Sequence, residues 1–197
     1  MNKKELQRQE SNKRILDAAM IEFSKNNYQV ATLTEIAVRA DVSKGLVTLR
    51  FGSKAGLFLE LVKLVCEKEL VFPNNPIKSF NDAVIDVVAY SKYLAKEKLN
   101  VAKFLYRFFV CYEYIPEDSR ETLKEHVRTN KSLKYFESEA KAGKINKRLD
   151  AFGALNLFMT NCLSLSISTV NAGVDFIPDK DYLVMLPLIL EPKKKGK

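Results

Sequence analysis

The sequence is poor in the residues that interrupt helices or carry out chemistry. It has seven Gly and six Pro in 197 residues, and most of the Pro residues fall between apolar-periodic stretches. So few helix breakers favour a helical protein with short connections. It has no Trp and a single His, His126. One His, with no glycine-rich phosphate loop, no metal-ligand spacing and no nucleophile–base pair, argues against an enzyme and predicts neither a cofactor nor a metal.

Cysteines and long apolar runs are also scarce. Cys66, Cys111 and Cys162 are widely spaced, form no CxxC pair and lie among apolar residues. We expect them to be small buried hydrophobes in a reducing compartment rather than redox or metal sites. The longest apolar stretches, such as 183–190, are too short to span a bilayer, and the first residues lack an export segment. The sequence therefore predicts a cytoplasmic protein without membrane contact.

The net charge of +8 is unevenly distributed. Residues 1–52 hold nine Lys or Arg against six Asp or Glu, and the segment 193–197 alone carries four Lys. Half of the excess charge thus lies in a short basic tail, which we interpret as a solvated end. Charge alone is weak evidence for a nucleic-acid partner, so the case depends on a motif.

Apolar residues recur with a helical period almost throughout the chain. The pattern predicts a first helix over 5–26, ended by Asn26 and Asn27, since Asn tolerates left-handed backbone. The residues Thr32 to Glu35 fit a capping box, and Ser43 and Ser53 are in position to cap further helices. The later helices are predicted at 33–40, 43–49 and 53–71 and, beyond a Pro-containing break at 72–76, at 77–98, 101–114, 117–142, 148–172 and 179–190.

Two of these helices, at 33–40 and 43–49, are short and joined by a three-residue turn, which is the layout of a helix-turn-helix. Asp41 occupies the turn position that usually takes Gly, and we expect it to adopt a positive φ. Gly45 is unusual inside a helix, where it costs about 1 kcal/mol against Ala. Either close approach to DNA or a crowded helix crossing would explain that glycine.

The residues in and around the motif form a specific pattern, made up of Arg14-Ile15-Leu16-Asp17-Ala18-Ala19, Phe23, Thr32, Glu35-Ile36-Ala37, Ala40, Val42-Ser43-Lys44-Gly45, Phe51, Ser53-Lys54 and Leu57-Phe58. Over about residues 11–60 this pattern closely resembles the N-terminal domain of the tetracycline-repressor (TetR) family. The rest of the chain is similar to the family only in length, helicity and layout. The resemblance implies an all-α fold with an N-terminal three-helix DNA-binding domain (1–52), a linking helix (53–71), a helical ligand-binding and dimerisation domain (72–192) and a basic tail (193–197).

Carried over to this chain, the resemblance implies that the helix beginning at Ser43 lies in the major groove of double-stranded DNA. The matching base-facing positions are Lys44, Gly45, Leu46 and Thr48, and the matching phosphate-gripping positions are Thr32, Arg50 and Lys54. Thr32 and Lys54 lie at helix N-termini, whose free amides attract a phosphate. Lys44 can donate to guanine O6 or N7, and Leu46 can contact a thymine methyl. The family usually has Tyr in place of Thr48 and Tyr or His in place of Arg50, so we expect an operator that differs from common family operators.

The resemblance also implies a homodimer on a palindromic operator, because one helix-turn-helix reads few base pairs and two copies must lie about 34 Å apart. Apolar residues surround almost the whole predicted helix over 148–172, so it must bury two sides. Together with 182–190 it can form half of an intermolecular four-helix bundle, with an intramolecular core as the alternative. The candidate interface residues are Phe152, Leu155, Met159, Leu163, Leu186 and Leu190.

Surplus aromatic residues around the predicted helix 101–114 indicate a pocket for a small, largely apolar effector, although aromatic stripes at helical spacing are more often core. The candidate lining residues are Tyr93, Phe104, Phe108, Phe109, Cys111, Tyr112 and Phe136. Arg107 and Glu113 are candidates for orienting the ligand. Binding of the effector would swing the helix over 53–71 and release the operator, with Gly56 either easing that movement or incidental to it.

The sequence therefore predicts a DNA-binding transcriptional regulator, most simply a dimeric repressor that a small effector releases. Two alternatives stay open. One is an activator or a DNA-organising protein of the same fold. The other is a helical small-molecule carrier or interaction protein whose helix-turn-helix is vestigial.

Overall fold

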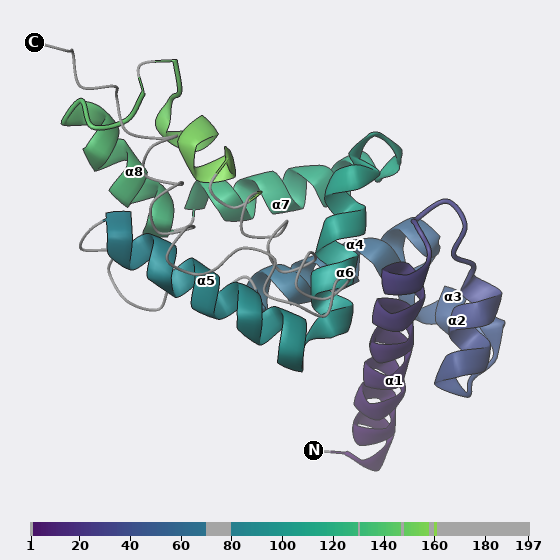
Figure 1. The fold of residues 1–197 in the computed structure, drawn as a ribbon. Coiled ribbons are helices and arrows are strands. Elements are labelled where there is room, and N and C mark those ends of the chain that lie inside the picture. Colours follow the sequence, from purple (N-terminus) through teal and green to yellow (C-terminus); the bar gives the residue numbers. More distant parts are fainter. Residues whose placement is uncertain (1, 70–79, 130, 147, 158–159, 161–197) are drawn as a thin grey trace, which may run out of the picture. The chain divides into compact units, whose positions relative to one another are not determined.

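In the computed structural model of the chain, residues 2–69, 80–129, 131–146, 148–157 and 160 are described. Their elements are α1 (Lys3–Lys25), α2 (Leu33–Ala40), α3 (Lys44–Phe51), α4 (Lys54–Lys68), α5 (Phe80–Glu97), α6 (Leu99–Val110), the 3-10 helix η1 (Tyr112–Tyr114), α7 (Glu117–Thr129) and α8 (Lys131–Lys141). Every regular element among these residues is a helix, which confirms the predicted all-α class (Figure 1). No helix in this part of the chain combines the length and the apolar composition needed to cross a membrane.

The chain divides into two compact units. The first holds residues 1–70 and 100–124, and the second holds 71–99 and 125–197. The helices α1 to α4 and nearly all of α6 therefore belong to the first unit, and α5 and α8 belong to the second. The predicted functional boundaries, after residue 52 and around residue 72, stay a prediction.

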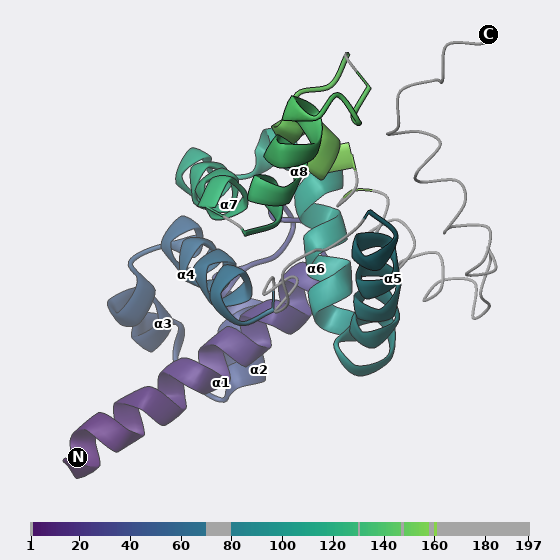
Figure 2. The same ribbon diagram turned by 90° about the vertical axis from the view of Figure 1, so that its left-hand side faces the viewer.

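α1 is a long helix whose C-terminal half supplies its buried face. The Asn2 side chain caps its first turn and accepts a hydrogen bond from the Lys4 amide at 3.2 Å. The N-terminal turns are mostly exposed and extend beyond α2 (Figure 2). The apolar face is at most 3% exposed, as the periodicity predicts, and consists of Ile15, Ala18, Ala19 and Phe23.

The end of α1 differs from the expected geometry. The helix ends at Lys25, and Asn26 is extended, with φ −118° and ψ 150°. No Asn among the described residues has a positive φ. The side chain of Asn27 instead accepts a hydrogen bond from the Val30 amide at 3.0 Å. The expectation of a left-handed Asn was therefore wrong, because a side-chain hydrogen bond closes this turn without it.

The turn between α2 and α3 has the predicted left-handed residue. Asp41 has φ 54° and ψ 54°, and its amide donates to the carbonyl oxygens of Ala37 and Val38 at the end of α2. This conformation costs a residue with a side chain roughly 1–2 kcal/mol. The Arg14 guanidinium on α1 lies 3.6 Å from the Asp41 carboxylate, which draws the turn toward α1.

The start of α4 packs closely against the end of α3. α3 runs two residues beyond its predicted end and is followed by Gly52 with φ 74°. Ser53 caps α4 as predicted, because its hydroxyl accepts from the Gly56 amide at 3.1 Å. A Cβ at Gly56 would fall far inside contact distance of the Phe51 carbonyl oxygen. Glycine is therefore required at this position, and its place there is not incidental.

Phe58 on α4 is the centre of an aromatic core in the first unit. Its ring centroid lies 4.9 Å from that of Phe23, 5.0 Å from Tyr28, 5.4 Å from Phe104 and 6.1 Å from Phe108. Two of these partners come from α1 and the loop after it, and two come from α6. The three helices α1, α4 and α6 therefore share one core.

The helices predicted beyond residue 77 are present with shifted bounds. α5 lies within its predicted range, whereas α6 ends four residues before the end of the predicted 101–114, with η1 after it. The predicted 117–142 contains α7 and α8, and Gly143 follows them with the left-handed φ of 69° expected at a helix end. Residues 151–157 are helical, whereas the rest of the predicted 148–172, apart from 148–150 and 160, and all of 179–190 lie outside the described residues.

Candidate nucleic-acid interface

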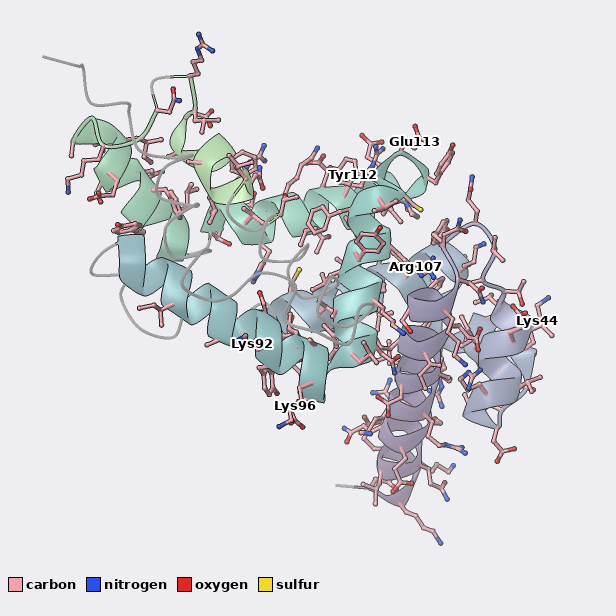
Figure 3. The ribbon with its side chains drawn as sticks, viewed as in Figure 1. Lys44, Lys92, Lys96, Arg107, Tyr112 and Glu113 are labelled. Carbon is pink, nitrogen blue, oxygen red and sulfur yellow. The ribbon has the colours of Figure 1, made fainter. Side chains whose placement is uncertain are left out.

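The outward face of α3 is exposed along its whole length. Val47 is fully buried on the opposite side and anchors the helix to the unit. Ser43 caps the helix, since its hydroxyl accepts a hydrogen bond from the Leu46 amide at 3.1 Å. Figure 3 shows Lys44 at the outer edge of this region, away from α1. The predicted base-facing residues therefore share one surface, with Lys44, Gly45 and Thr48 exposed and Leu46 partly covered.

Gly45 has no neighbour in the chain that requires the absence of a side chain. A Cβ at this position would meet only the Ser43 hydroxyl oxygen, at 3.8 Å, which is an ordinary van der Waals contact. Its φ is not positive either. Among the described residues a crowded helix crossing is therefore excluded as the reason for this glycine. Close approach by another molecule is the explanation that is left.

Thr32, predicted to grip a phosphate, is already bound within its own helix. Its hydroxyl accepts from the Glu35 amide at 3.2 Å and donates to the Glu35 carboxylate at 2.7 Å. The Glu35 carboxylate in turn accepts from the Thr32 amide at 3.1 Å. The predicted capping box is thus confirmed, and the Thr32 hydroxyl has its proton committed to Glu35.

Lys54, the second predicted phosphate ligand at a helix start, fastens the loop before α2 to the start of α4. Its ammonium donates to the carbonyl oxygens of Gln29 and Ala31, both at 3.1 Å. It also lies 4.7 Å from the centroid of the Tyr28 ring, within the range of a cation–π interaction. An ammonium has three donors, so one donor is not used by these two carbonyls.

Arg50 keeps an unsatisfied donor at the end of α3. Its Nε is buried and has no hydrogen-bond partner among the described residues. The pKa of Glu5 is lowered chiefly by a hydrogen bond from Arg8, and the charge of Arg50 adds to this effect. The buried Nε is closed to an acceptor from outside the chain, so a phosphate contact by Arg50 stays a prediction.

A buried ion pair that sequence reasoning missed holds α2 against α1. The Arg39 guanidinium lies 2.6 Å from the Glu22 carboxylate, whose side chain is only 7% exposed. Two charged residues seventeen positions apart give no local signal in the sequence. The pair uses Nε and Nη2 of Arg39, whose side chain is 37% exposed.

Leu49 is the surface residue that sequence reasoning missed on α3. It is 79% exposed, the highest value among the large hydrophobic side chains of the described residues. It follows Gly45 by four residues and so lies on the same face of the helix. The four-residue spacing to Gly45 is visible in the sequence, but there Leu49 marks only the end of the predicted helix 43–49.

The predicted effector residues on α6 fall into two groups. Phe104 and Phe108 are each 2% exposed and pack against Phe58, so their rings belong to the core of the first unit. Phe109 is 39% exposed, and the Tyr112 ring stacks edge-on against Phe108 at 6.0 Å. Cys111, between them in the sequence, is partly covered.

The other two predicted effector residues belong to the second unit. Tyr93 on α5 is 45% exposed and stacks on Tyr90 at 6.3 Å. Phe136 on α8 is fully buried, with its ring edge-on to Tyr135 at 5.6 Å. A lining that joins these residues to those of α6 stays a prediction.

Arg107, expected as a candidate to orient a ligand, binds the end of α1 instead. Its Nε donates to the Ser24 carbonyl oxygen at 2.8 Å, and Figure 3 shows it reaching from α6 toward α1. The Ser24 hydroxyl lies 3.2 Å from the side-chain oxygen of Asn100, two turns earlier on α6. Glu113, the other candidate, is exposed on η1. Two residues of α6, Asn100 and Arg107, thus contact the buried Ser24 of α1.

The predicted dimer residues are only partly described. Phe152 is half-buried, and Leu155 is 2% exposed. The other four, Met159, Leu163, Leu186 and Leu190, lie outside the described residues. The dimer interface stays a prediction.

The cysteines offer little reactivity where the structure describes them. Cys66 is buried, and burial, with a smaller contribution from Glu67, raises the pKa of its thiol to about 12. Cys111 is partly covered, and Cys162 lies outside the described residues. Within the described ranges, no three His, Cys, Asp or Glu side chains gather closely enough to hold a metal ion.

The N-terminal part of the chain is similar to a known family of bacterial proteins. Residues 15–61 match the family model described as bacterial regulatory proteins, tetR family. No curated protein matches the sequence. The match covers α2 and α3 entirely, together with most of the buried part of α1 and the first half of α4.

Solved structures share the fold at low sequence identity. A TetR family transcription regulator from Marinobacter aquaeolei VT8 has a TM-score of 0.72 at 11% identity, covering 95% of this chain and 98% of its own. GusR from Salmonella enterica has a TM-score of 0.68 at 20% identity, with coverages of 91% and 95%. NalD, the secondary repressor of the MexAB-OprM multidrug efflux pump in Pseudomonas aeruginosa, has a TM-score of 0.60 at 21% identity, with coverages of 93% and 97%. At these identities the likeness extends to the fold alone.

Proposed function

We propose that this chain, whose residues 15–61 match the TetR family of bacterial regulatory proteins, is a dimeric repressor of transcription. It binds a palindromic operator through α3, and a small, largely apolar effector releases it. As a DNA-bound regulator it works in the cytoplasm.

The observation that carries the proposal is the unexplained glycine on an exposed helix face. Gly45 costs α3 about 1 kcal/mol relative to Ala. No contact among the described residues benefits from that cost, because a Cβ would have room. A helix that enters the major groove brings its backbone close to base edges and phosphates, where even a methyl group would intrude. The outward face of α3 is therefore shaped for a partner, and Lys44 beside the glycine supplies the charge that DNA attracts.

Phosphate contacts would come from Arg50, Lys54 and Thr32. Arg50 places a permanent positive charge in the last turn of α3, and Lys54 has a donor beyond the two that bind carbonyls. Thr32 stands at the N-terminus of α2, where its hydroxyl is committed but the amides of the first turn point outward. The first two residues thus offer positively charged side chains to a phosphate, whereas Thr32 offers its helix end.

We propose a dimer because specific recognition of an operator needs more base pairs than one recognition helix reads. One helix in the groove reads only a few base pairs, and a second copy about 34 Å away doubles the site. The half-buried Phe152 lies at the start of the predicted dimer helices. We propose that this helix and the chain beyond it bury their apolar sides against a second copy.

Release by an effector is supported by the way α6 is attached. α6 packs on α4 through Phe104 and Phe108 and binds the end of α1 through Arg107. A ligand that shifts α6 would therefore move both helices that hold the helix-turn-helix. Moving most of the population from bound to released needs several kcal/mol of differential affinity. Phe109 at the end of α6 is 39% exposed, and Tyr112 on η1 is partly covered. Their rings are the best placed to contact a small apolar ligand.

The test is a chemical footprint of the purified full-length protein on DNA from upstream of its own gene. Dimethyl sulfate methylates guanine N7 in the major groove and adenine N3 in the minor groove. We expect guanine N7 atoms to be protected in two patches about one helical turn apart, and a Lys44→Ala variant to lose part of this protection. Equal binding to scrambled DNA would favour a DNA-organising protein. No binding at all would favour a carrier with a vestigial motif.

A reporter gene downstream of the protected site then separates a repressor from an activator. Lower expression in the presence of the protein supports repression, and higher expression contradicts it.

A further inference from the structure

Leu49 contributes almost no burial free energy to the folded protein, because its side chain stays in water. Single exposed hydrophobic residues are common on protein surfaces, and Val38 on α2, 76% exposed, is one of them. What distinguishes Leu49 from Val38 is its position on the face of α3 that carries Gly45 and Lys44.

Gly45 and Leu49 together leave a gap on this face. Side chains on a helix lean toward its N-terminus, so Leu49 leans over the turn that contains Gly45. No side-chain atom of Leu49 lies within 4 Å of the place where a Cβ of Gly45 would stand, and the Ser43 hydroxyl oxygen lies 3.8 Å from it. The gap thus has the backbone of Gly45 as its floor and the Leu49 methyl groups as one wall. Thr48 and Lys44 neighbour it on the same exposed side.

We propose that Gly45 and Leu49 form an apolar notch that receives the C5-methyl group of a thymine, which makes Leu49 a residue that determines sequence preference. This inference rests on the proposed function, since it requires α3 to lie in the major groove. The thymine methyl is the apolar group that base edges present there. The Ser43 hydroxyl at the edge of the notch already accepts a hydrogen bond from the Leu46 amide, and the Leu49 side is apolar. Such a notch fits that methyl and leaves the hydrogen-bonding edges of neighbouring bases to Lys44 and Thr48.

The notch accounts for two features that are otherwise unrelated. The glycine removes the one side-chain carbon that would fill the gap, and the exposed leucine gains the burial on DNA that it lacks in the free protein. Leu46, expected from the sequence to contact a thymine methyl, is more covered by its own unit than Leu49. Leu49 is therefore the better placed of the two leucines.

The test uses the DNA fragment identified by the footprint, with each thymine in the protected patches replaced in turn by uracil, which lacks only the methyl group. For the wild-type protein we expect one position in each half-site at which uracil weakens binding about fourfold, the effect of one methyl group leaving water. In the Leu49→Ala variant, uracil at that position should cause no further loss. Val38→Ala, which removes an equally exposed apolar side chain from α2, is the matched control and should keep the wild-type response.

The outcomes separate this inference from the proposed function. If the wild-type protein binds specifically but the same uracil weakens the wild type and Leu49→Ala equally, the notch is wrong and the DNA-binding function stands. If no thymine position is sensitive, the notch is also wrong. If the wild-type protein has no specific DNA site, both the notch and the proposed function are wrong. Because Leu49 is exposed, Leu49→Ala should unfold at the same denaturant midpoint as the wild type, which excludes misfolding as the cause of a lost response.

Discussion

The outward face of α3 and the aromatic side of α6 both carry large apolar side chains, but the structure buries these side chains to very different degrees. Phe104 and Phe108 of α6 are buried against Phe58. Leu49 of α3 is 79% exposed, and Gly45 beside it has open space where a side chain would be. The apolar residues of α6 are explained largely by packing within the chain, and Leu49 on the outward face of α3 is not.

The difference in burial shows which of these residues point to a function and which are explained by stability alone. A buried aromatic ring contributes to stability whether or not a ligand ever binds near it, so its presence says little about a pocket. An exposed leucine adds no burial free energy and a helical glycine reduces stability, and two such features without an internal benefit indicate a partner. The case for DNA binding by α3 is therefore stronger than the case for an effector site on α6.

The largest expected effect comes from removing the ring that joins the three helices of the first unit. Phe58→Ala should lower the free energy of unfolding by about 3–5 kcal/mol, because it leaves a cavity among four aromatic neighbours. Urea unfolding of the full-length protein measures the change. Leu49→Ala is the contrasting variant and should stay within about 0.5 kcal/mol of the wild type. A loss below about 1 kcal/mol for Phe58→Ala would mean that this aromatic cluster is not the core.

A smaller effect on stability is expected at Lys54, which both packs within the chain and is proposed to contact DNA. Lys54→Ala removes two hydrogen bonds from a charged donor to carbonyls, at Gln29 and Ala31, and should lower the free energy of unfolding by about 1–2 kcal/mol. It should also weaken binding to all DNA sequences and flatten the salt dependence by about one phosphate.

Lys44→Ala is the matched control for Lys54→Ala, since Lys44 is exposed. It should leave stability within about 0.5 kcal/mol of the wild type and reduce only the discrimination among operator sequences. Equal stability losses in the two variants would contradict the distinction between a lysine that holds the loop and a lysine that reads DNA.

Much of the N-terminal architecture could be predicted from the sequence, because its signals are local. The capping box at Thr32 and Glu35 and the caps at Ser43 and Ser53 depend on neighbours three residues away. The left-handed Asp41 depends on the length of the turn. All of these are confirmed by the structure.

The features that could not be predicted depend on contacts between distant parts of the chain. The ion pair between Glu22 and Arg39 and the hydrogen bond from Arg107 to Ser24 join residues 17 and 83 positions apart. The role of Gly56 depends on the path of the backbone at Phe51. Periodicity says which face of a helix is apolar, but it does not say which partner covers that face.

The most direct test of the central claim is a single variant with two readouts. Gly45→Ala should raise the free energy of unfolding by up to about 1 kcal/mol, since alanine favours the helix and its methyl group has room in the free protein. The same variant should bind the footprinted DNA fragment more weakly, because that methyl group intrudes on the groove. Higher stability together with weaker binding is the predicted result. A variant that gains stability and binds the fragment as tightly as the wild type would contradict the claim that this face of α3 is reserved for DNA.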